Sequence, residues 1–166
     1  MTAPFEPPTP AILDVVERWH RYLGGDVPGR LDELLDDDVM LYSPVVYTPQ
    51  AGNEIVTRYL TAAALTFPGD KAATALGHAL HYTKQLFAAD TAVLEFETSM
   101  AGKDVNGVDI IRINEHGRIV EFRVMVRPLQ AVHAVHQHTG AALVSLGDPV
   151  TTSVTASLAP DTQATS

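Results

Sequence analysis

Asp109 is the residue whose type and position most clearly suggest chemistry. It lies in the segment "VDIIRIN", among valine and isoleucine residues typical of a buried strand. Alternate side chains of a strand point to opposite faces, so Asp109 shares a face with Ile111 and Ile113, and Arg112 takes the other. A guanidinium group is expected in solvent, which turns Asp109 toward the interior. A carboxyl group there has to be hydrogen-bonded, protonated or next to a wet cavity, and it is a candidate general acid or base. A purely structural interpretation stays open, in which the carboxylate sits at a strand edge and accepts hydrogen bonds from a helix N-terminus.

Four segments of strand type are expected to position this carboxyl group: "HALHYTKQLF", "TAVLEFETSMAG", "VNGVDIIRIN" and "GRIVEFRVMV". The turns between them are short, which predicts antiparallel pairing. Helical periodicity predicts helices at 12–23 and 54–67, the second capped by Asn53, with a shorter helix at 29–35 between them. A strand is expected at 39–44, a loop at 45–52, and a last helix from Pro128 to about residue 143.

This order of elements predicts an α+β fold, in which a curved antiparallel sheet carries helices across its concave face. The expected domain organisation is a flexible leader at 1–10, one domain at 11–147 and a tail rich in Thr, Ser and Ala at 148–166. Strand alternation predicts that one side of each strand faces the helices. The predicted inward set includes Leu94, Phe96, Thr98, Met100, Phe122 and Val124.

Composition excludes several functional classes. The formal net charge of −9 disfavours nucleic acid and anionic membrane surfaces, and there are no cysteines for disulfides or thiolate metal sites. No apolar run is long enough for a membrane helix, and a cytoplasmic location is expected. The sequence lacks a Gly-rich phosphate loop, GxSxG and HExxH, so we expect no cofactor. Metal binding by His133 and His136, or by the acidic run 36–38, is the weaker interpretation of those residues.

The segments "DDDVMLYSP", "AGNEIVTRYL" and above all "VDIIRINEHGRIVEFRV" resemble the nuclear transport factor 2-like superfamily, over about residues 11 to 130. This superfamily includes ketosteroid isomerases, SnoaL-type polyketide cyclases and limonene-type epoxide hydrolases. The resemblance implies a cone-shaped fold: a bent sheet wrapped on three N-terminal helices, here with an extra C-terminal helix, and an apolar pocket opening at one end. Because the fold hosts many activities, the resemblance implies a fold more firmly than a function.

Within the superfamily, "VDIIRINEHGRI" is especially similar to the ketosteroid isomerase segment that carries the oxyanion-hole aspartate, and the match falls on Asp109. Ungapped spacing carries the family's catalytic-base aspartate onto Ser43 and its oxyanion tyrosine onto Trp19, and neither residue can do the same chemistry. Tyr22, one helical turn on, is a weak substitute donor. Epoxide hydrolases have an arginine where this chain has Gly107. SnoaL-type cyclases rely mainly on one aspartate, which Asp109 provides.

Three functions stay open at this point. The first is a cofactor-free isomerase, cyclase or lyase that acts on an apolar carbonyl compound through Asp109. The second is a protein that binds an apolar ligand without chemistry, and the third is a dimeric interaction module. The residues expected to shape the pocket are Trp19, Tyr22, Tyr42, Ser43, Phe96, Thr98, Phe122 and Val124, with Tyr47 and Tyr59 near its mouth. His78 and His81 fall on opposite strand faces, and alternation does not decide which of them faces inward.

A homodimer is expected through the outer face of the sheet. Met125 there accompanies the arginines at 112, 123 and 127 and the acids Glu95 and Glu97, which are expected to pair across strands. A face that mixes apolar and oppositely charged side chains suits a self-complementary two-fold interface.

Overall fold

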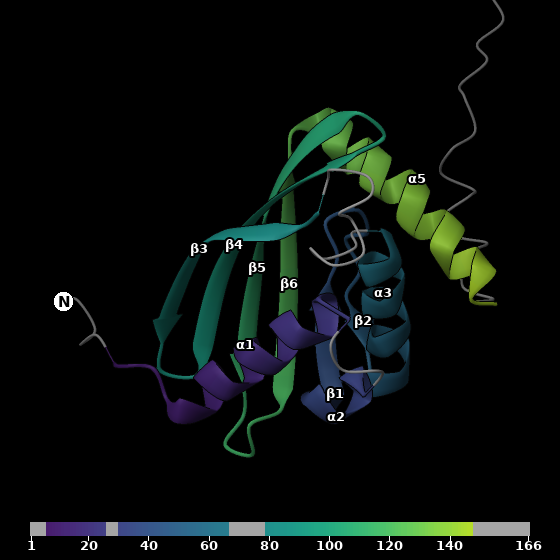
Figure 1. The fold of residues 1–166 in the computed structure, drawn as a ribbon. Coiled ribbons are helices and arrows are strands. Elements are labelled where there is room, and N and C mark those ends of the chain that lie inside the picture. Colours follow the sequence, from purple (N-terminus) through teal and green to yellow (C-terminus); the bar gives the residue numbers. More distant parts are fainter. Residues whose placement is uncertain (1–5, 26–29, 67–78, 148–166) are drawn as a thin grey trace, which may run out of the picture.

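The computed structural model describes residues 6–25, 30–66 and 79–147, and the fold within them is α+β, as predicted. A curved sheet wraps around helix α1, with α3 beside β1 and α5 crossing the far end (Figure 1). The helices are α1 (Pro10–Leu23), α2 (Leu31–Leu34), α3 (Asn53–Thr66) and α5 (Leu129–Ser145). The strands are β1 (Leu35–Tyr42), β2 (Gln50–Ala51), β3 (His81–Ala88), β4 (Thr91–Met100), β5 (Lys103–Ile113) and β6 (Ile119–Arg127).

The six strands follow the order β2-β1-β6-β5-β4-β3. The meander from β3 to β6 is antiparallel, as the short turns predicted. The prediction of a wholly antiparallel sheet is corrected at one place: β1 pairs with β6 in parallel, because α3 and the meander separate these strands in sequence and return the chain to the same end. The short strand β2, which pairs with β1, lies in the segment predicted as a loop.

The concave side of the sheet and the helices enclose the main core. Helix α1 contributes Ile12, Val15, Val16 and Trp19, all at most 3% exposed, and the sheet supplies Leu94, Ile111 and Phe122 among others. The predicted alternation holds on β5, where Ile111 and Ile113 are buried and Arg112 is exposed. A second apolar cluster lies where α5 packs on β4 and β5, and it includes Phe96, Met100, Val105, Ala131 and Val135.

Part of the predicted leader is attached to the sheet. The Thr9 amide donates to the Ala89 carbonyl group, and the Ala89 amide donates to the Glu6 carbonyl group. The Thr9 side chain also accepts a hydrogen bond from the Ile12 amide and so caps α1. The predicted 148–166 tail lies outside the described residues, as does His78. In the described part of the chain, no helix is both long and apolar enough to cross a membrane.

Asn53 joins three elements, although it was predicted only to cap a helix. Its side-chain amide donates to the carbonyl groups of Asp32 and Leu35, each at 3.0 Å. Its side-chain oxygen accepts from the Thr57 hydroxyl group. The start of α3 is therefore attached to α2 and to the first residue of β1.

Asn53→Asp should destabilise the protein, although it keeps the shape of the side chain. The new carboxylate cannot donate, and it faces two carbonyl oxygens, so we expect the free energy of unfolding to fall by about 1 to 3 kcal/mol. Urea denaturation checks this. Gln50→Glu, three residues away, adds the same charge but disturbs only a local bond to the Thr48 carbonyl group, and it should stay within about 0.5 kcal/mol of wild type. Equal losses in both variants would show that added charge, rather than the lost donors, is responsible.

Candidate functional site

Asp109 projects from the concave face of β5 into the apolar core. It is 5% exposed, and its strand neighbours on the same face, Ile111 and Ile113, are buried too. The Tyr82 hydroxyl group on β3 donates to Asp109 Oδ2 at 2.7 Å. This is the one hydrogen bond to the carboxyl group among the described residues, so Oδ1 is left for another partner.

Trp19 on α1 fixes the direction of that hydrogen bond. Its indole Nε1–H donates to the Tyr82 oxygen at 2.8 Å. An indole N–H can only donate, so the single hydroxyl proton of Tyr82 is directed to Asp109. Residues from a helix and two non-neighbouring strands thus form a chain of hydrogen bonds, Trp19 to Tyr82 to Asp109, which we call the Asp109 relay. Trp19 also stacks edge-on against Phe122, with ring centroids 5.0 Å apart, which holds the indole in place.

Burial changes the acidity of both groups. Loss of hydration raises the pKa of Asp109 from 3.8 to about 7, and the hydrogen bond from Tyr82 lowers it in part. Burial raises the pKa of Tyr82 well above 10, helped by the charge of Asp109. Near neutral pH, Tyr82 is therefore a neutral donor, and Asp109 is divided between its acid and its carboxylate.

His20 packs against Tyr82, with ring centroids 4.9 Å apart. Its Nε2 is inaccessible to solvent and has no hydrogen-bond partner in the described part of the chain. Burial lowers the pKa of His20, so no imidazolium is expected beside the relay at neutral pH.

Asp109 borders an apolar cavity of about 60 Å³, which we call the Asp109 chamber. Four predicted pocket residues line it: Trp19, Phe96, Phe122 and Val124. Leu23, Leu60, Ala63, Ala64, Leu80 and Tyr82 complete the described lining. Apart from Asp109 and Tyr82, these residues carry no titratable side chain, so the chamber presents one acid within an apolar wall.

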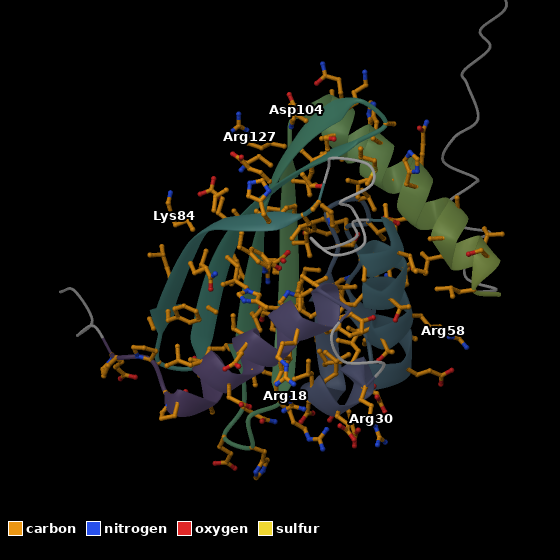
Figure 2. All side chains as sticks on the ribbon, viewed as in Figure 1. Arg18, Arg30, Arg58, Lys84, Asp104 and Arg127 are labelled. Carbon is orange, nitrogen blue, oxygen red and sulfur yellow. The ribbon has the colours of Figure 1, made fainter. Side chains whose placement is uncertain are left out.

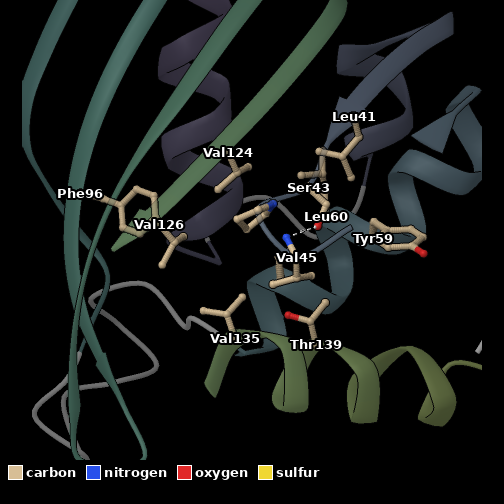
Figure 3. A pocket seen from close by; sticks show the side chains of 12 residues that line it. Leu41, Ser43, Val45, Tyr59, Leu60, Phe96, Val124, Val126, Val135 and Thr139 are labelled. Atoms are coloured by element: carbon tan, nitrogen blue, oxygen red, sulfur yellow. Dashed lines mark hydrogen bonds between the residues drawn. The ribbon is translucent and has the colours of Figure 1, made fainter. Parts of the chain in front are cut away.

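A second chamber of about 60 Å³ adjoins the first, and we call it the Ser43 chamber (Figure 3). Leu60, Ala63, Phe96 and Val124 line both chambers, so the two are neighbours. Ser43, predicted as a pocket residue, and Tyr59, predicted near the mouth, lie here with Val45, Val135 and Thr139.

Other predicted pocket residues lie elsewhere. Tyr42 is stacked under Arg123 of β6, with the guanidinium carbon 3.8 Å from the ring centre; this pair occupies the outer face of the sheet. Tyr22 hydrogen-bonds to Thr61 and lines a polar hollow beside α2. Thr98 is buried on β4 but is not among the described residues lining either chamber. Tyr47 and His81 are exposed.

The polar hollow beside α2 is larger, about 300 Å³, but its charges are largely paired with one another. Arg30 contacts Glu33 at 2.8 Å, and Arg18 contacts Asp14 at 3.8 Å. Across residues 6–25, 30–66 and 79–147, no group of three or more His, Asp or Glu side chains could hold a metal ion.

Tyr82 is the residue of the site that the sequence analysis missed. It lies in a predicted strand in which only His78 and His81 were considered as residues that could face the pocket. Alternation does place Tyr82 opposite His81, so an inward tyrosine was a usable signal. Its pairing with Asp109 was not, because β4 separates their strands and only the curvature of the sheet brings the two side chains together.

No family model and no curated protein matches the sequence. Solved structures do match. A steroid delta-isomerase from Pseudomonas aeruginosa is 29% identical, with a TM-score of 0.74 over 85% of this chain and 97% of that one. A nuclear transport factor 2-like protein of unknown function from Mesorhizobium loti is 22% identical, with a TM-score of 0.59 over 77% and 100% of the two chains. A putative polyketide cyclase from Sinorhizobium meliloti is 17% identical, with a TM-score of 0.50 over 68% and 94%.

The two less identical proteins establish likeness of fold, and the isomerase adds sequence identity over nearly its whole length. The likeness of fold and the sequence identity agree with the resemblance to nuclear transport factor 2-like proteins found in the sequence. With its curved six-stranded sheet and the helices on its concave face, the chain has the nuclear transport factor 2-like fold.

Proposed function

We propose that the protein is a cofactor-free isomerase, cyclase or lyase that uses Asp109 as its acid/base group on an apolar carbonyl compound. The observation that carries the proposal is a buried carboxyl group with a pKa of about 7 at the wall of an apolar chamber. A group that titrates near the working pH can both take and return a proton. The steroid delta-isomerase and the putative cyclase among the similar structures support this class of small-molecule chemistry.

The proposed chemistry begins with Asp109 as a carboxylate. Its free oxygen takes a proton from a C–H bond next to the ligand carbonyl group, and the C–H electron pair moves toward the carbonyl oxygen to form an enolate. The neutral acid then returns the proton to another carbon, which isomerises the ligand. Alternatively, the enolate carbon attacks a second carbonyl group, which closes a ring, and the alkoxide formed there takes the proton from Asp109. Asp109 ends each cycle in the state in which it began.

The relay limits which ligands can react. The Tyr82 proton is directed to Asp109 Oδ2, so among the described residues no second donor of the Asp109 chamber is available to the enolate oxygen. The ligand itself must then delocalise the negative charge of the enolate, as conjugated ketones and dicarbonyl compounds do. The same feature favours the alternative function, a binding protein in which Asp109 only hydrogen-bonds an apolar ligand.

Asp109→Asn should remove the pH dependence that ionisation of Asp109 imposes on stability. In the unfolded chain the carboxyl group ionises near pH 3.8, whereas in the folded chain it stays protonated to about pH 7. Between these values the unfolded state binds fewer protons, so the free energy of unfolding falls as pH rises, and above about pH 7 the loss is complete. Relative to wild type, the variant should therefore gain roughly 2 to 4 kcal/mol between pH 4 and pH 8 in urea titrations.

The control is Asp104→Asn on the same strand, where the carboxyl group is exposed (Figure 2). Because this side chain is exposed, the substitution should change the free energy of unfolding by no more than about 0.5 kcal/mol. If Asp109→Asn instead loses about 1 to 3 kcal/mol at pH 8, the carboxylate is a structural acceptor of hydrogen bonds, and the proposed function loses its main residue.

A ligand screen tests the function directly. We expect ketosteroids, anthraquinone-type polyketides or terpene ketones to raise the melting temperature, because a ligand that binds only the folded state stabilises it. A compound that binds is then incubated in D₂O, and its deuterium content is measured by mass spectrometry. Wild type should exchange C–H protons next to the carbonyl group, and Asp109→Asn should bind the compound but slow exchange by at least about 100-fold.

Gly107→Ala is the matched variant for this experiment, because it should weaken ligand binding while it retains Asp109. The Phe96 ring lies directly on Gly107, and an added methyl group would meet the Cζ and Cε1 atoms of the ring and the backbone carbonyl oxygen of Met125, the last at 2.8 Å. The ring would have to move within the two chambers that it lines, and β6 would have to shift. Binding without exchange in wild type would favour the binding protein, and unchanged binding in Gly107→Ala would show that the ligand lies outside the chambers.

We also propose a homodimer through the outer face of the sheet. Leu86, Val93 and Ile110 form an apolar row across β3, β4 and β5, and Val108 and Met125 form the next. Both signs of charge flank these rows, in the pairs Lys84–Glu95 and Arg112–Glu121. The predicted partners of Glu95 are corrected here, because its carboxylate contacts Lys84 and Asn106 rather than the arginines at 123 and 127.

Light scattering at micromolar concentration should give the mass of a dimer, about twice 17.9 kDa. Met125→Asp should give a monomer, because Met125 is 53% exposed at the centre of the face and a buried unpaired carboxylate is costly. Leu129→Asp is the control, since Leu129 is equally prominent but lies at the start of α5. A monomeric wild type would contradict this proposal, as would dissociation of both variants.

A further inference from the structure

The polar hollow beside α2 is larger than either chamber and carries charged groups on its wall. Its volume is about 300 Å³, which falls at the lower end of the range for small-molecule sites. The described lining has more guanidinium groups than carboxylates and bears one net positive charge: Arg18, Arg21 and Arg30 with Asp14 and Glu33. The whole chain has a formal net charge of −9, so a positive hollow is an exception on this surface.

Two elements bring the arginines together. Arg18 and Arg21 lie three residues apart on α1 and therefore on one side of that helix. Arg30 directly precedes α2, and it lies at the same end of the molecule as Arg18 (Figure 2). The buried side chains of Leu31 and Leu34 supply an apolar part of the same wall. The hollow therefore combines cations with apolar surface.

The ion pairs within the hollow leave its cations available to a ligand. Arg30 contacts Glu33 and Arg18 contacts Asp14, but all four side chains are at least 40% exposed. An ion pair in solvent adds little stability, so a ligand carboxylate can replace either acid at small cost. The Arg21 side chain forms no ion pair with any residue that the structure describes. One cation of the hollow is therefore without an acid partner among those residues.

We propose that this hollow binds a small organic acid with a single carboxylate group and an apolar body. A guanidinium group presents its N–H donors in a fork that matches a carboxylate, and one negative charge balances the net charge of the described lining. Leu31, Leu34 and the ring of Tyr22 are the contacts for the apolar body. The residues described for the hollow line neither chamber, so the inference does not depend on the proposed function.

A carboxylate and its neutral amide test the site. Phenylacetate and phenylacetamide have nearly the same shape and differ in charge, and each is titrated into ¹⁵N-labelled protein at neutral pH. Phenylacetate should shift the backbone amide NMR signals of Arg21, Leu31 and Leu34. Its dissociation constant should be roughly 3- to 10-fold lower than that of the amide, a modest ratio because the arginines are exposed. NaCl at about 0.5 M should bring the ratio close to one, since salt screens exposed charges.

Two variants should change the affinity for phenylacetate in opposite directions. Arg21→Gln removes the cation without an acid partner and should weaken binding roughly 3- to 10-fold. Asp14→Asn removes the acid that contacts Arg18 and should strengthen binding roughly 2- to 5-fold. A damaged fold would weaken binding, so a gain in the second variant reports the charge of the hollow.

Arg58→Gln is the matched control. Arg58 is an arginine paired with Glu54 on α3, away from the hollow, and its loss changes the net charge of the protein as Arg21→Gln does (Figure 2). This variant should keep the wild-type affinity for phenylacetate. Equal losses in the two arginine variants would overturn the inference, because the effect would then come from the charge of the whole protein.

Other results would also overturn the site. They are absence of phenylacetate binding to wild type, equal dissociation constants for the acid and the amide, and unchanged binding in Arg21→Gln. Signal shifts confined to residues of the Asp109 chamber, such as Leu80 and Phe122, would place the ligand elsewhere and have the same consequence.

Discussion

Burial of one carboxyl group in an apolar core is the constraint on which the rest of the site depends. An unpaired carboxylate at this depth would cost more free energy than a domain of this size can lose. The chain reduces that cost in two ways. The pKa of Asp109 rises to about 7, so the group is neutral for much of the time, and Tyr82 donates to it when it is charged. Trp19 completes the arrangement because its N–H occupies the Tyr82 oxygen and leaves the hydroxyl proton for Asp109.

The curvature of the sheet makes this arrangement possible. Tyr82 and Asp109 lie on β3 and β5, with β4 between them, and a flat sheet would hold their side chains apart. Bending toward the helices brings both side chains under α1, where the Trp19 indole donates a hydrogen bond to Tyr82. Gly107 contributes on the same strand as Asp109, because the missing side chain gives the Phe96 ring a place against the backbone and leaves space in front of the acid. Gly107, against which the Phe96 ring rests, and Asp109, which borders the chamber, are therefore two positions apart on β5.

The relay also distinguishes this chain from the ketosteroid isomerase pattern that its sequence resembles. In that pattern a tyrosine and a protonated aspartate both donate to the ligand. Here the tyrosine comes from β3 and donates to the aspartate itself, and the residues carried over from the family's tyrosine and base are Trp19 and Ser43. Trp19 serves the aspartate indirectly, and Ser43 lies in the neighbouring chamber. One fold thus retains a buried acid while the groups around it change, which agrees with the general separation of fold and function.

Local patterns in the sequence predicted most of the elements and the faces of the meander strands, although strand β2 lies in a segment predicted as a loop. Period-two alternation assigned Asp109 to the interior and Arg112 to solvent, and short turns predicted the antiparallel meander, because both depend on residues close together in the chain. Of the ten other residues that line the Asp109 chamber, four had been predicted as pocket residues: Trp19, Phe96, Phe122 and Val124. The parallel pairing of β1 with β6, the outward position of Tyr42 and the contact between Tyr82 and Asp109 did not follow from local patterns. Each depends on how distant segments meet once the sheet bends, and the energy of such contacts is set by burial and geometry that no local pattern contains. The sequence by itself determined that an acid would be buried, and the tertiary structure alone decided which donor would hold it.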